Sequence, residues 1–360
     1  MTHNHPRARA KGRTLMTAAA FAMAAASASA VAADQAATPD KLSGSITITV
    51  AGGTYGTFIK QKVARPFHDR TGVTVNTVDG LTMQNLATLR ATKNNPSVDV
   101  ASFDPPGAFP AADEGLLLKL DPAKLPNMTQ MYPWAVAKDG QLVGVLASNQ
   151  CLAYNTKFIK TPPASWEDMW NPAYKGHVAL PDISTSHGVM MLLIMSKIAS
   201  NSSDLYDADK AFGKLETLKP NVLTYWTNHD QLSQLMNSGQ VWLAPWTADR
   251  AATQENQGAP IDCVLPKEGA IFFTSFSGIA RNSRNPDAAY AYLNTQISAQ
   301  SQAEAANEIF LGPTNSDVKM TGKPLKYLDP TRAGLVRPDW DKVMQMTPQW
   351  TDIWNRRMQK

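Results

Sequence analysis

Strands and amphipathic helices follow one another from residue 46 onward, and this order restricts the possible folds more than any other feature of the sequence. The elements expected in the first series are a strand at 46–50, a helix at 54–69, a strand at 73–78, a helix carrying Leu86 and Leu89, and a strand at 98–101. Gly52-Gly53 predicts the first turn, and Pro105-Pro106 is expected to break the last strand. Such a series predicts a mostly parallel sheet covered by helices.

The same pattern returns in the second half of the chain. The expected elements there are strands at 144–154, 178–180, 221–225 and 241–245, a helix that opens at Ser184-Thr185-Ser186, a helix that ends near 237–239, and a helix capped by Asn285 with Pro286 at its first position. No polar linker separates the two series, which indicates an α/β protein of two lobes joined by short crossing strands. Ligands of open α/β sheets bind beyond the carboxyl ends of the strands, so we expect a site in a cleft between the lobes.

Residues 1–33 have the layout of a cleaved secretory signal peptide. A positively charged start without acids precedes an apolar, Ala-rich run at 15–26, and small residues at 30–33 suit a cleavage site. The run is short for a transmembrane helix. We therefore expect residues 34–43 to be a flexible start of a mature, periplasmic protein. The alternatives are a disordered leader or an N-terminal anchor.

The charge of the expected mature chain is balanced. The sequence has 34 Lys and Arg against 30 Asp and Glu, and Arg7, Arg9, Lys11 and Arg13 lie in the leader, so 30 of each sign remain. A neutral surface argues against nucleic acid or an anionic membrane as the main partner.

Motifs of catalysis and metal binding are missing from the sequence. It contains no G-x-S-x-G, Walker, G-x-G-x-x-G or H-E-x-x-H motif, and its histidines show no metal-ligand spacing. We therefore expect no catalytic residue, no metal and no cofactor. The two cysteines, Cys151 and Cys263, form either one disulfide or two buried thiols.

Four separated motifs occur in order between residues 46 and 315. They are the opening strand, turn and helix that end in 67–73, residues 114–117 with Leu120-Asp121, residues 154–155 with 165–176, and residues 266–272 leading into 285–289. In order and spacing they resemble the extracellular solute-binding proteins of ABC importers, in the family of periplasmic spermidine/putrescine-binding proteins. The resemblance implies a type II periplasmic-binding-protein fold, in which two α/β lobes close on a ligand.

The resemblance also implies where the lobes begin and end. Lobe 1 is expected at 44–150 and 276–319, and lobe 2 at 151–275 and 320–360. The chain is expected to cross between them near 148–151 and 274–276.

The expected ligand site departs from the polyamine binders. The aromatic position at Trp246 is kept, whereas Phe273 and Ser275 stand where that family has Trp and Asp, residues 184–187 (Ser-Thr-Ser-His) replace a loop with two acids, and the opening turn has no Trp. Most carboxylates that would anchor a cationic chain are therefore absent.

The replacements suit an anion. The Gly52-Gly53 turn and Ser184 to Ser186 lie at predicted helix starts, which favour negative charge, although the serines serve equally as N-caps. Arg250 or Arg281 is a candidate to complete the site, and Asp104 either binds a ligand amine or caps the turn at 105–106. The candidate ligand-binding residues are Gly53, Thr54, Tyr55, Asp104, Ser184, Thr185, Ser186, Trp226, Trp246, Phe273 and Ser275.

The sequence therefore predicts a monomeric periplasmic protein that captures a small carboxylate-bearing solute, amino-acid-like or opine-like, for the permease of an ABC importer, without enzymatic activity. A polyamine ligand is the first alternative. Exported hydrolysis with a nucleophile among Ser184, Ser186 and Ser275 is another, and metal transport is a third.

Overall fold

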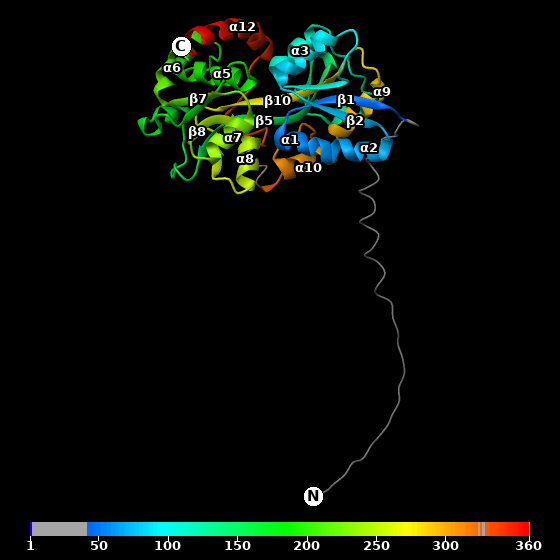
Figure 1. The fold of residues 1–360 in the computed structure, drawn as a ribbon, viewed down its shortest axis with the longest axis horizontal. Helices are drawn as coiled ribbons and strands as arrows, with labels where there is room; N and C mark the ends of the chain where they lie inside the picture. The colour runs from blue at the N-terminus through cyan, green and yellow to red at the C-terminus, as the bar shows by residue number, and fades with distance from the viewer. Residues whose placement is uncertain (2–41, 323–324, 326–327, 360) are drawn as a thin grey trace. The chain divides into compact units, whose positions relative to one another are not determined.

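The computed structural model describes Met1 and residues 42–322, 325 and 328–359 (Figure 1). Apart from Met1, the expected signal peptide at 1–33 lies outside the described residues, as does most of the expected flexible start. Within the described residues, no helix is long and apolar enough to cross a membrane.

Strands and helices alternate as the sequence predicts. The strands are β1 (Ser45–Val50), β2 (Thr74–Asp79), β3 (Val100–Phe103), β4 (Val136–Ala137), β5 (Leu142–Asn155), β6 (Val178–Pro181), β7 (Val222–Trp226), β8 (Leu243–Thr247), β9 (Ile261–Val264), β10 (Ala270–Ile279) and β11 (Leu335–Val336). The α-helices are α1 (Gly53–Phe58), α2 (Arg65–Thr71), α3 (Thr82–Thr92), α4 (Pro105–Asp113), α5 (Ser186–Ser200), α6 (Ala208–Leu218), α7 (His229–Asn237), α8 (Ala248–Asn256), α9 (Pro286–Gln296), α10 (Ala299–Ile309) and α12 (Trp340–Arg357). A π-helical segment, η1 (Ile59–Ala64), joins α1 to α2, and short 3₁₀ turns include η5 (Trp166–Trp170).

The described strands form one sheet in the order β2-β1-β3-β10-β5-β8-β6-β7. The outer strands pair in parallel, as expected for each lobe, whereas β10 and β5 pair antiparallel to each other and to their neighbours β3 and β8. Along β5 the partner changes between Asn149, which lies opposite β10, and Gln150, which lies opposite β8. The chain therefore passes from one set of strands to the other at this point, and the full lobe boundaries stay a prediction.

The β6 and β8 part of the sheet is covered by helices on both faces. Leu180 and Leu243 pack in a core with α5, α6 and α12, while Ala179 and Ala244 pack in another with α7 and α8. Figure 1 shows the first set of helices above these strands and the second set below. Neighbouring strand residues face opposite sides, which explains why nearly every residue here is apolar.

The predicted helix at 54–69 is present but contains a π-helical segment. Pro66 is the second residue after η1 and has no backbone N–H, and its ring crowds the carbonyl one turn earlier. The N–H of Arg65 donates to the carbonyl of Lys60, five residues back. The helix therefore accommodates proline by widening one turn.

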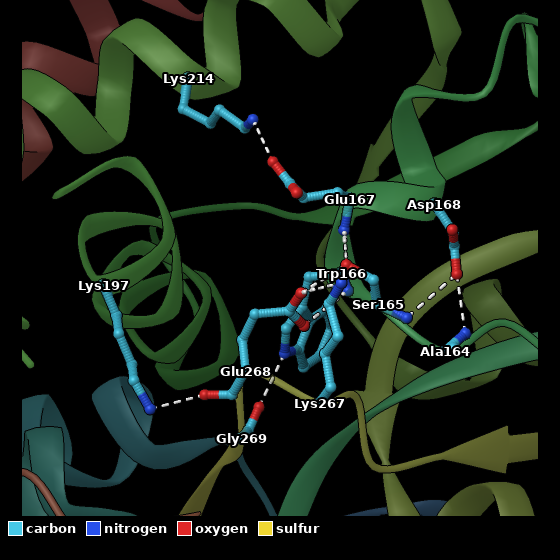
Figure 2. Close-up of polar contacts among 10 residues, drawn as sticks. All are labelled: Ala164, Ser165, Trp166, Glu167, Asp168, Lys197, Lys214, Lys267, Glu268 and Gly269. Carbon is cyan, nitrogen blue, oxygen red and sulfur yellow. Dashed lines mark hydrogen bonds and ion pairs between the residues drawn. The ribbon is translucent and has the colours of Figure 1, made fainter. Parts of the chain in front are cut away.

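Two of the motifs that carry the family resemblance pack against each other (Figure 2). Ser165 Oγ donates to Glu268 Oε1 at 2.5 Å, and the indole of the fully buried Trp166 donates to the carbonyl of Gly269 at 2.8 Å. Lys197 of α5 donates to the carbonyl of Glu268 at 2.6 Å. These motifs join η5 to the start of β10, so their role is structural.

The cysteines are two free, buried thiols in the structure. Cys151 lies on β5 and Cys263 on the neighbouring strand β9. The residue directly opposite Cys263 is Ala153, two positions along β5 from Cys151. Burial, followed by a hydrogen bond to Cys263, raises the pKa of the Cys151 thiol.

Candidate functional site

A cavity of about 500 Å³ lies where several strands end and the following helices begin. The starts of α3, α4, α5, α7 and α8 all contribute lining residues, together with β10 and β5. Each helix start carries partial positive charge and backbone N–H groups without helical partners. This is the cleft position that the sheet order predicts.

Most of the predicted ligand-binding residues line this cavity. They are Tyr55, Asp104, Ser184, Thr185, Ser186, Trp226, Phe273 and Ser275. The others, Gly53, Thr54 and Trp246, are not among its lining residues. The structure thus brings the former set together from segments far apart in the sequence, and ligand contact by each of them stays a prediction.

Asp104 lines the cavity and does not form the expected cap of a turn at 105–106. Pro105-Pro106 does not form a turn, because the two prolines are the first residues of α4, where a missing N–H has no cost. Asp104 stands at the N-cap, yet its side chain caps nothing. Its two oxygens accept hydrogen bonds of 2.5 Å from Ser186 Oγ and Ser275 Oγ. One carboxylate thus connects α4, α5 and β10 at the cavity.

The glycine turn lies beside the cavity. Gly53 has a φ of +71°, and a Cβ there would come within 3.1 Å of Asp230 and 3.3 Å of Arg250. The preceding Gly52 and both of these charged residues line a smaller hollow of about 220 Å³. Thr54 lines neither space. The close approach at this turn is therefore to side chains of α7 and α8, and contact of Gly53 and Thr54 with the ligand stays a prediction.

Trp246 is not a lining residue of the cavity, and its contact with a ligand stays a prediction. Its side chain is 1 % exposed and packs in the core between β8 and the helices α7 and α8. Its indole Nε1 donates to His229 Nδ1 at 2.8 Å, and His229 in turn lines the cavity. Trp246 thus lies behind the cavity wall, because β8 directs it into the sheet's buried face.

Sequence reasoning missed three titratable lining residues, His187, His229 and Asp249. Each lies in the first turn of a helix that follows a predicted strand or cap, and this position is the signal that would have found them. Of the two candidate arginines, Arg250 lines the cavity, whereas Arg281 is held elsewhere by the carbonyl of Gly115.

Burial lowers the pKa of both histidines, which favours their neutral forms. Burial lowers the pKa of His187, with nearby carboxylates opposing the shift. Burial, then the positive charge of Arg250, holds the pKa of His229 well below its usual range. Burial also raises the pKa of Tyr55 to about 12, so that its hydroxyl, which accepts from Gln296, keeps its proton.

Several buried polar atoms of the wall have no hydrogen-bond partner within the described residues. They are Nδ1 of His187, Nε1 of Trp226 and Oγ1 of Thr247. Trp226 is 1 % and Thr247 2 % exposed. Leaving such groups unpaired is costly, so they point to a polar ligand that bonds with them.

The arrangement of these polar groups suits the binding of a small polar solute. The hydroxyls of Ser186 and Ser275 each donate a hydrogen bond to the carboxylate of Asp104. Among the described residues, no group of three or more His, Cys, Asp and Glu is arranged to hold a metal ion.

Comparison with known proteins gives the family. Residues 62–327 match the family described as bacterial extracellular solute-binding protein. The chain is 25 % identical to the gamma-aminobutyric acid-binding protein of Pseudomonas aeruginosa over 295 residues, which cover 78 % of this chain and 80 % of that protein. It is 28 % identical to the spermidine/putrescine-binding periplasmic protein of Escherichia coli over 187 residues, 50 % of this chain and 53 % of that protein. This second match thus spans about half of the relative's length.

A solved structure agrees with this assignment. The crystal structure of an ABC transporter protein from Clostridium perfringens superposes with a TM-score of 0.68 at 26 % identity, covering 87 % of this chain and 99 % of that one. The fold, the cavity at the strand ends and the match over 62–327 lead to one conclusion. The chain belongs to the family of bacterial extracellular solute-binding proteins.

Proposed function

We propose that this protein is the solute-binding component of an ABC importer and that its ligand is a small zwitterion, with a carboxylate or comparable anionic group and an amine. The observation that carries the ligand class is the state of Arg250. Its side chain is 14 % exposed, lines the cavity, and makes no hydrogen bond within the described residues. Its ion pair with Asp249 is long, 3.8 Å between Nε and Oδ2.

A mostly buried guanidinium whose N–H groups make no hydrogen bond is best paired with a ligand group that has several hydrogen-bond acceptors. It has five N–H donors in a planar fork, and a carboxylate accepts two of them side by side. The starts of α7 and α8 add positive dipole ends next to Arg250. We therefore place the anionic end of the ligand here.

The amine end belongs near Asp104. The first turn of α4 begins with two prolines, so it offers fewer N–H donors to an anion than the other helix starts. Asp104 supplies a negative charge at this point, and its two hydroxyl partners are neutral. Desolvating an ammonium against this carboxylate is less costly than elsewhere in the cavity.

The names of two relatives support a ligand that carries an anionic group, an amine or both. One is named for gamma-aminobutyric acid, a zwitterion, and another for spermidine and putrescine. A polyamine is the second candidate, because Asp249 adds a second carboxylate and Trp226 and Phe273 add aromatic faces to the wall. Arg250 opposes that alternative, since it places a buried positive charge beside a cationic ligand.

Calorimetry at one salt concentration tests the ligand class. We expect γ-aminobutyrate to bind more tightly than butyrate, butylamine, putrescine or spermidine. Replacing Arg250 with Gln removes the charge facing the carboxylate and should cost about 2–5 kcal/mol of binding. Arg281→Gln is the matched control, because this arginine lies outside the cavity. Tighter binding of a polyamine than of every acid, or equal affinities of the two variants, would contradict the proposal.

Export and delivery complete the proposed role. The layout of residues 1–33 supports a cleaved signal peptide, and the family's printed description is extracellular. We expect a monomer whose mature N-terminus lies near Ala33 or Asp34. N-terminal sequencing of protein from the producing cell checks the cleavage, and an intact Met1 on the soluble protein would refute it.

A further inference from the structure

We propose that Trp246 is a positioning residue that fixes His229 as an N–H donor toward the anionic end of the ligand. The inference rests on the proposed function for its ligand and on one contact for its geometry. Trp246 Nε1 lies 2.8 Å from His229 Nδ1. The indole N–H can only donate, so Nδ1 of His229 must accept and carries no proton.

The proton of the neutral ring therefore sits on Nε2. His229 is neutral because burial and the adjacent positive charge of Arg250 lower its pKa. A neutral imidazole has one N–H, and the partner of one nitrogen decides which nitrogen bears it. Since Trp246 is 1 % exposed and held in the core, its N–H direction is set by packing.

The Nε2 atom has no hydrogen-bond partner in the described part of the chain, although His229 lines the cavity. The unpartnered indole N–H of Trp226 lies on the same wall, with the two rings 5.5 Å apart between centroids. Arg250 lines this wall as well. The wall thus presents the N–H donors of His229 and Arg250, which suit a carboxylate and not an ammonium group.

Other titratable and charged groups surround His229 and affect how its protonation changes with pH. His187 faces it from α5, with ring centroids 4.9 Å apart, and Arg250 faces it from α8. Asp79 of β2 and Asp230 of its own helix line the smaller hollow with it, and Asp249 lies on the same cavity wall. These groups affect how readily the His229 ring is protonated, whereas the proposal concerns which nitrogen of the neutral ring carries the proton. A measurement of the tautomer therefore tests the proposal separately from the pH response.

A spectroscopic experiment on the ligand-free, full-length protein tests the tautomer. In ¹⁵N-histidine correlation spectra at pH 7.5, we expect His229 to carry its proton on Nε2. Trp246→Phe keeps the aromatic packing and removes the donor, so the preference should disappear. Trp170→Phe is the control, because that indole donates to Thr217 at 2.8 Å and does not line the cavity. A proton on Nδ1 in the wild type would overturn the proposal even if Trp246→Phe failed to fold, as would an unchanged Nε2–H preference in a folded Trp246→Phe variant.

Calorimetry with γ-aminobutyrate tests the donor role. Trp246→Phe should weaken binding about three- to tenfold, the effect of one hydrogen bond. His229→Gln, whose amide reaches toward the Nε2 position, should lose less affinity than His229→Leu. Unchanged affinity in Trp246→Phe would overturn the donor role. Absence of γ-aminobutyrate binding to the wild type would count against the proposed ligand class, while the spectra would still decide whether Trp246 sets the tautomer.

Discussion

Replacing Gly188 with Ala should displace one wall of the cavity. Gly188 lies in the first turn of α5, directly after Ser186 and His187, and its N–H donates to Thr185 Oγ1 at 3.1 Å. An added Cβ would lie 2.2 Å from the carbonyl oxygen of Asp182. Ordinary contact begins at 3.4 Å, so backbone must move by more than 1 Å.

The magnitude follows from two opposing effects. Forcing an extra methyl group into packed backbone costs about 1–3 kcal/mol, and alanine regains up to about 1 kcal/mol over glycine in a helix. We expect a net loss of about 1–2 kcal/mol in the free energy of unfolding. Affinity for the ligand should fall too, because Ser186 and His187 move with the helix start.

Urea unfolding followed by tryptophan fluorescence measures this loss. Gly213→Ala is the matched control, since Gly213 lies inside α6 and the nearest atom to its Cβ would be Arg357 Nη2 at 3.9 Å. That variant should gain about 0.5–1 kcal/mol. If Gly188→Ala proved as stable as Gly213→Ala, the close packing of the α5 start would be refuted.

Further predictions concern titration and burial. His187 and His229 have folded-state pKa values below the unfolded value of 6.5, so the unfolded chain binds more protons than the folded one. The free energy of unfolding should therefore fall as pH drops below about 6.5. A His187→Asn/His229→Gln double variant should show a smaller fall in this free energy between pH 7 and 5, measured by urea unfolding. Tyr292→Phe removes a buried hydroxyl with no partner among the described residues, so it should leave stability within about 1 kcal/mol or raise it, and a larger loss by calorimetry would reveal a missing bond. Arg357 donates to both oxygens of Glu216 and lowers the pKa of this carboxyl. Glu216→Gln should therefore lower the melting temperature slightly at pH 7, and the difference should shrink as pH falls below 4.5 through the lowered pKa, whereas a difference that stayed constant below pH 4.5 would contradict the assignment.

The order of elements was predictable because it depends on local patterns. The alternation at 46–50 and the cap at Ser184-Thr185-Ser186 correspond to β1 and the start of α5, whose N-cap is Thr185. Local patterns could not show the π-helical segment before Pro66 or that Pro105-Pro106 begin a helix, because both depend on how the backbone groups are satisfied in three dimensions. The site positions at strand ends followed from the same order, since parallel strands end at one edge of a sheet.

The sequence by itself determined the alternating α/β architecture, the strand-end position of the site and eight of the residues that line it, because periodicity and capping act over a few residues. Only the tertiary structure decided which polar groups meet there. Asp104 reaches Ser186 and Ser275 across 82 and 171 residues of chain, and Arg250 rather than Arg281 enters the cavity. It also placed the indole N–H of Trp246 in hydrogen-bond contact with His229. These outcomes depend on the packing of helices from distant segments, which sets side-chain direction and burial and is not encoded in the spacing of any one motif.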